Sequence, residues 1–173
     1  GMYSSLNGTP KYLGELAQSL YNGLSRQIML LKCIQPLNTL RRIEVAVPSK
    51  AEFEPGFYRW LERLARLASN LECRMQFHGR NETMSLIAEY MQNRHPGVRT
   101  QYTPMAHWNE LPQLSAGIAD DHLFVVVTAR KGTVSYKAAL EHLPEELAQH
   151  FSGKNLMIIY PDQHGVAGNM MTY

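Results

Sequence analysis

Short apolar runs alternate with amphipathic stretches along most of this chain. The run from Leu123 to Val127 is too short for a helix and rich in valine, which predicts a buried central strand. Apolar runs at residues 43–47 and 155–160, and an alternating run at 71–77, predict three more strands. Residues 98–103 are shorter and more polar, as is typical of an edge strand.

Helical periodicity is found between these runs. Helices are expected over residues 53–67, with Phe53 and Phe57 on the apolar face, and over 81–91, with Asn81 as the cap and Met84, Ile87, Ala88 and Met91 facing inward. Two shorter helices are expected over 108–118, with Pro112 in the first turn, and over 135–142. Pro144 ends the latter, and a further turn or two runs to Phe151.

Strict alternation of strands and helices predicts an α/β fold: a five-stranded parallel open sheet with helices on both faces. Before it, residues 10–24 have helical spacing and residues 27–34 resemble a strand. We therefore expect an N-terminal helix-strand appendage over 1–40, an α/β domain over 41–163 and an irregular tail over 164–173.

Composition narrows the function classes. The chain has 173 residues, 45% hydrophobic and 18% charged, and a net charge of +2 without a basic segment, so we expect no nucleic-acid partner. Cys33 and Cys73 are far apart and lack a CxxC partner, which favours reduced thiols in a cytoplasmic compartment. The apolar runs are far shorter than the roughly 20 residues that cross a bilayer.

A basic, hydroxyl-rich turn follows the predicted central strand. Ligands of open α/β sheets bind at the carboxyl ends of the strands, so this turn is a candidate site for an anion or nucleotide, although such a turn is more often only a solvated basic loop. The candidate ligand-binding residues at this edge are Arg130, Lys131, Gly132, Thr133 and Ser135, together with Ser49, His78 and Arg80.

No catalytic or metal-binding pattern is present. The histidines show no HExxH spacing, and each lies in or beside a predicted turn or helix end, where a solvated imidazole is common. No GxSxG motif or Ser-His-Asp order occurs. We therefore expect no catalytic residues, no metal and no enzyme activity. The seven histidines are His78, His95, His107, His122, His142, His150 and His164.

Three segments carry a family resemblance: RRIEVAVP (41–48), DDHLFVVVTARKG (120–132) and NLMIIYP (155–161). They resemble the universal stress protein domain, an adenine nucleotide alpha hydrolase-like fold with strand order 3-2-1-4-5. With QPLNTL (35–40), the chain is also similar to the cytoplasmic region of bacterial cation/proton antiporters, where such domains follow the membrane helices, often as a tandem pair.

The resemblance implies a non-catalytic regulatory or interaction domain at the cytoplasmic face of the inner membrane. Its partners would be the membrane transport domain of the same polypeptide and a second copy in a homodimer. A free-standing universal stress protein, binding a nucleotide or other anion at the carboxyl end of the sheet, is the alternative. An enzyme with adenylate chemistry is a third, which would need phosphate-cradling and acid-base residues that this sequence lacks.

The nucleotide motif of the family is broken here. Nucleotide-binding members carry G-x2-G-x9-G-[ST] after the fourth strand, where glycines let backbone amides approach phosphates. Ala129 replaces the first glycine, Gly132 fits the second, and His142 replaces the third. The acidic residue expected after the first strand is missing, since Val47 runs into Pro48. We therefore expect no ATP cofactor.

The tetrapeptide ELAQ occurs twice, at 15–18 and 146–149, each time before a strand-like run. Either this is chance, or the chain begins with the end of a preceding repeat. Stress-protein domains commonly pair last strand against last strand, so the repeat predicts that residues 27–34 lie antiparallel beside 155–160, within one chain or across a dimer. The residues expected to make this pairing are Met29, Leu31, Met157 and Ile159.

Overall fold

The structure is a computed structural model that describes residues 27–105, 110–129 and 143–162. Its strands are β1 (Ile28–Lys32), β2 (Arg42–Ala46), β3 (Arg74–Gly79), β4 (Thr100–Pro104), β5 (His122–Val127) and β6 (Asn155–Tyr160). Its helices are α2 (Phe57–Leu71), α3 (Asn81–Arg94), α4 (Leu111–Ser115) and α5 (Leu143–His150), with the short 3₁₀ turns η1 (Leu37–Thr39) and η2 (Ala51–Phe53).

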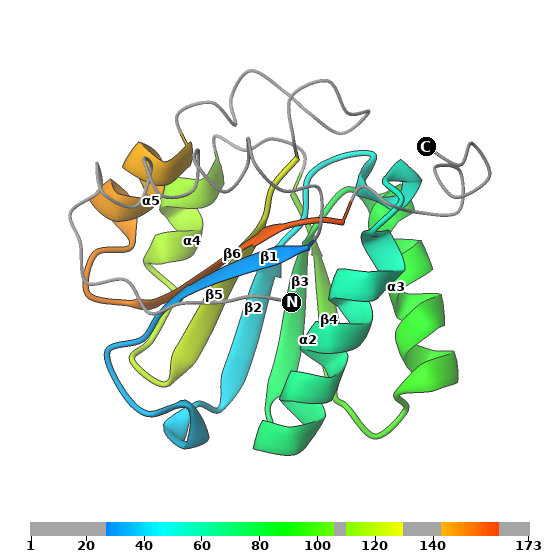
Figure 1. Ribbon diagram of the computed structural model, residues 1–173, viewed down its shortest axis with the longest axis horizontal. Helices are drawn as coiled ribbons and strands as arrows, with labels where there is room; N and C mark the ends of the chain where they lie inside the picture. Colours follow the sequence, from blue (N-terminus) through cyan, green and yellow to red (C-terminus); the bar gives the residue numbers. More distant parts are fainter. Residues whose placement is uncertain (1–26, 106–109, 130–142, 163–173) are drawn as a thin grey trace.

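All six strands form one mixed sheet in the order β1-β6-β5-β2-β3-β4 (Figure 1). Strands β2 to β6 are all parallel to one another. If these five are renumbered 1 to 5 along the chain, their order in the sheet is 3-2-1-4-5. The sheet differs from the predicted five-stranded parallel sheet in having a sixth strand, β1, which is antiparallel. The polar strand β4 lies at the far edge, as expected.

Helices cover both faces of the sheet, as α2 and α3 lie on one side and α4 and α5 on the other (Figure 1). Side chains alternate across each strand, so β5 sends Val125 into the core under α2 and α3 and Phe124 into the core under α4 and α5. Residues Leu123 to Val127 are fully buried, because β5 has a neighbour on each edge and helices on each face.

The appended strand β1 pairs with β6 in antiparallel register within the same chain. Met29 lies opposite Ile159 and Leu31 opposite Met157, which are the residues expected for this pairing. The edge of the parallel sheet at β6 is thereby covered by an element that precedes the domain in sequence.

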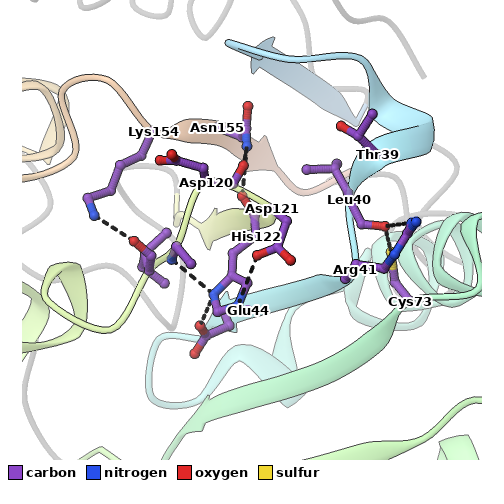
Figure 2. A network of polar contacts seen from close by, with 12 residues as sticks. Thr39, Leu40, Arg41, Glu44, Cys73, Asp120, Asp121, His122, Lys154 and Asn155 are labelled. Carbon is purple, nitrogen blue, oxygen red and sulfur yellow. Dashed lines mark hydrogen bonds and ion pairs between the residues drawn. The ribbon is translucent and has the colours of Figure 1, made fainter.

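Asn155, the first residue of β6, joins three segments at the amino end of the sheet, and Figure 2 shows it beside Asp120 and His122. Its side chain is fully buried. The Oδ1 atom accepts the backbone N–H of Ile34 at 2.8 Å, and Nδ2 donates to the carbonyls of Asp120 at 2.8 Å and His122 at 2.9 Å. One amide group thus joins the exit of β1 and the entry of β5 to β6.

Several local predictions were wrong or too long. Phe53 lies in η2 with 67% of its surface exposed, because the α-helix begins only at Phe57. Asn81 is the first helical residue of α3 and not its cap, which is Arg80 without a side-chain hydrogen bond. Of the helix expected over 108–118, the described residues 110–118 form an α-helix only over Leu111–Ser115, with Pro112 in its first turn as predicted. The helices expected over 10–24 and 135–142 lie outside the described residues.

Candidate functional site

The predicted ligand-binding edge is described only in part. Arg130, Lys131, Gly132, Thr133 and Ser135 lie outside the described residues. The three others lie at or just beyond the carboxyl ends of neighbouring strands: Ser49 after β2, His78 near the end of β3, and Arg80 just after β3.

Two of these side chains have buried polar atoms without partners among the described residues. The hydroxyl oxygen of Ser49 and Nδ1 of His78 are both shielded from solvent and make no hydrogen bond there. Arg80, in contrast, is exposed at the amino end of α3. An unpaired buried polar atom is costly and therefore usually meets a water or a ligand. Ser49 and His78 thus offer one hydroxyl and one ring nitrogen to a polar group at this edge.

A buried carboxylate lies between two imidazoles on the face of the sheet that carries α4 and α5. Glu44, in the middle of β2, approaches Nε2 of His78 with Oε1 at 3.0 Å and Nδ1 of His122 with Oε2 at 3.1 Å. Only 7% of the surface of Glu44 and 5% of the surface of His78 is exposed to solvent. A buried carboxylate needs such donors, so Glu44 and its two histidines act as one unit.

His122 has two competing partners at the same ring nitrogen (Figure 2). The backbone N–H of Ala119 points at Nδ1 from 3.2 Å, whereas the Glu44 carboxylate lies 3.1 Å from it. A proton on Nδ1 donates to Glu44, and its absence lets Nδ1 accept from Ala119. Asp121 lies 3.6 Å from the other nitrogen, Nε2, and favours a proton there. The tautomer of His122 therefore decides which hydrogen bond exists.

This network was not predicted from the sequence. His78 and His122 were expected to be solvated imidazoles near turns, which is wrong because both belong to strands and contact Glu44. The available signal was Glu44 itself, a lone acid within the apolar run Ile43 to Val47, since a charged residue in a buried strand requires partners.

A second polar cluster joins α2 to α3. Glu62 contacts Nε2 of His95 at 2.7 Å and Nε of Arg66 at 2.7 Å, and it accepts a hydrogen bond from the hydroxyl of Tyr90. The His95 contact, followed by those of Tyr90 and Arg66, lowers the pKa of Glu62 from 4.5 to about 2. Burial, reinforced by the neighbouring Glu62 carboxylate, raises the pKa of Tyr90.

This lowered pKa predicts an acid-dependent loss of stability at Glu62. The pKa of Glu62 is lower in the folded state than in the unfolded state. Its ionised carboxylate therefore contributes fully to the free energy of unfolding above pH 4.5, and this contribution is lost as the pH falls toward about 2. The difference in unfolding free energy between the unmodified chain and Glu62→Gln, measured with urea, should therefore shrink across this window. Glu89→Gln, at an exposed position of α3, is the charge-matched control. A difference that is independent of pH in this range would contradict the prediction.

The described residues contain no group of three or more His, Cys, Asp or Glu side chains arranged to hold a metal ion. Among the same residues, no helix combines the length and apolar character needed to cross a bilayer. Comparison of the chain with protein-family models finds no matching family, and comparison with curated proteins finds no match.

Proposed function

We propose that this chain is a non-catalytic regulatory or interaction domain of the universal stress protein type, and that it serves as the cytoplasmic part of a cation/proton antiporter. Its partner is then the membrane transport domain of the same polypeptide. The three sequence segments that resemble those families motivate the proposal.

One structural observation carries the proposal furthest: the antiparallel pairing of β1 with β6. In stress-protein dimers the last strand of one copy commonly pairs with the last strand of the other. β1 occupies the corresponding position beside β6 from within the chain, which is what a tandem arrangement of two such domains requires. A homodimer of this chain would then form through another surface, or through release of β1.

Transport measurements test the regulatory role. The native reading frame around this chain should encode a membrane domain of ten or more apolar helices upstream. Proton-coupled cation exchange in membrane vesicles should change in rate or in pH dependence when residues 27–162 are deleted from that polypeptide, while the membrane domain still reaches the membrane. A frame without membrane helices, or exchange that is identical with and without the domain, contradicts the proposal.

A second function is favoured by the unpaired atoms of Ser49 and His78. A free-standing stress protein that binds a nucleotide or other anion at the carboxyl end of the sheet would use such groups. Against it stands the broken glycine motif at Ala129, because the backbone of a phosphate loop must approach the ligand closely.

Thermal unfolding separates the two functions. A ligand that binds the native state raises the melting temperature, by an amount that grows with the logarithm of its excess over Kd. The regulatory domain should show no shift with ATP, ADP, AMP or cyclic dinucleotides in millimolar amounts that depends on Ser49. A shift that disappears in Ser49→Ala and persists in the exposed-site control Ser85→Ala would instead support nucleotide binding at the carboxyl edge.

A further inference from the structure

An open pocket of about 650 Å³ lies at the amino ends of β2, β3, β4 and β5, which is the end of the sheet opposite to the predicted ligand site. Four arginines contribute to its lining, whereas the described lining holds only two carboxylates. These residues are Arg41, Arg42, Arg74 and Arg99, with Glu72 and Asp121. The pocket therefore carries a local excess of positive charge.

The guanidinium groups are not neutralised within the described part of the protein. None of the four arginines has a carboxylate within ion-pair distance among those residues, and the guanidinium of Arg41 donates there only to the carbonyls of Asn38 and Leu40. Arg74 and Arg99 are exposed. Like charges gathered around one pocket repel one another, so an anion bound between them relieves this repulsion.

The backbone holds these arginines in fixed positions. Arg42 lies directly opposite Arg74 on β3 in the parallel register, so their Cα atoms are separated by about the 4.8 Å spacing of adjacent strands. The N–H of Arg74 donates to the carbonyl of Arg41 at 3.1 Å, and the carbonyl of Arg99 accepts from Met75 at 2.9 Å. Rigid strand ends reduce the entropy lost when a ligand is bound.

We propose that this pocket binds an anion with two or more phosphate groups. Guanidinium groups bind phosphate oxygens in pairs, and several of them suit a multivalent phosphate. The volume is within the range of about 300–1,000 Å³ that small-molecule sites occupy and exceeds what one phosphate needs. The described lining contains no Phe, Tyr or Trp, so recognition depends on charge and not on stacking of a base.

Titration calorimetry with pyrophosphate and tripolyphosphate tests the pocket. In about 0.15 M salt, which screens diffuse attraction, the chain should bind one equivalent saturably. The double variant Arg74→Gln and Arg99→Gln should weaken binding at least roughly tenfold. The control, Arg63→Gln and Arg66→Gln, has the same net charge and changes exposed arginines of α2 outside the pocket, so its affinity should be unchanged. Circular dichroism verifies that both variants are folded.

A membrane whose lipids carry phosphate headgroups presents several phosphates side by side, as a free oligophosphate does. Co-sedimentation with phosphatidylcholine vesicles, with and without phosphatidic acid, separates the two sources. The pocket is assigned to lipid headgroups if the chain binds the phosphatidic acid vesicles, if pyrophosphate displaces it from them, and if the variant Arg74→Gln/Arg99→Gln no longer binds. Binding of the soluble probes alone assigns it to a free phosphorylated compound.

Two results overturn the proposal. The first is the absence of saturable binding to either soluble probe and to the vesicles. The second is equal weakening by the pocket variant and the control, because binding would then follow net charge and not the pocket.

Discussion

Replacement of Asn155 with alanine is expected to lower the free energy of unfolding by about 3 kcal/mol or more, since each buried backbone group that loses its partner costs about 1–3 kcal/mol. The substitution leaves the N–H of Ile34 and the carbonyls of Asp120 and His122 without the amide that satisfies them. Urea unfolding measures the effect. Asn70→Ala, at an exposed position of α2, is the matched control and should change stability by no more than about 0.5 kcal/mol.

Asn155→Asp distinguishes loss of the donor from loss of the whole side chain. The aspartate keeps an acceptor for Ile34 but directs a carboxylate oxygen toward two carbonyls. It should be at least as destabilising as alanine at neutral pH and should recover at acid pH, where the protonated group can donate again. Equal stability of Asn155→Ala and the unmodified chain would show that this amide does not hold the three segments together.

Removal of the buried carboxylate by Glu44→Ala is expected to destabilise the protein by about 3 kcal/mol, in the range for breaking one side of a buried pair. Nε2 of His78 then loses its partner while Nδ1 already has none among the described residues. Glu44→Gln should cost less, because an amide can still accept from one imidazole and donate to the other. Denaturant unfolding of both variants measures the difference.

A double-mutant cycle tests whether Glu44 and His78 act together. If they do, Glu44→Ala should cost much less in a His78→Ala background than in the unmodified chain, with a coupling of at least about 1 kcal/mol. Additive losses would mean that the 3.0 Å contact contributes no specific stability.

The sequence was most informative where one residue pattern had one structural solution. The apolar runs at Ile43–Val47 and Leu123–Val127 required burial on both faces, so a parallel sheet with helices on each side could be predicted. The pairing of β1 with β6 was predicted from the repeated tetrapeptide ELAQ and the strand-like run that follows each copy. Periodicity alone could not locate the first residue of a helix. Phe53 has the spacing expected for the helix that follows, but it lies in the separate 3₁₀ turn η2.

The polar features were harder to predict because they depend on register between strands that are distant in sequence. Glu44 contacts His78 and His122 only because β2 lies between β3 and β5 in the sheet. No local sequence pattern predicts that order of strands. The arginine pocket had a local sign that went unused: Arg42, Arg74 and Arg99 each lie at or just before the start of a parallel strand. Residues of that kind converge at one end of any parallel sheet.

The pairing of β1 with β6 has a consequence for how the chain folds. Ile28 meets Tyr160 across a loop that contains almost the entire described chain, whereas each of the other strand pairs closes a shorter one. Closing a longer loop costs more conformational entropy, and contacts distant in sequence slow folding. β1 should therefore pair with β6 after the parallel strands have assembled during folding, and it should separate from β6 before they come apart during unfolding. Formation of the β1–β6 pair is then the last step of folding.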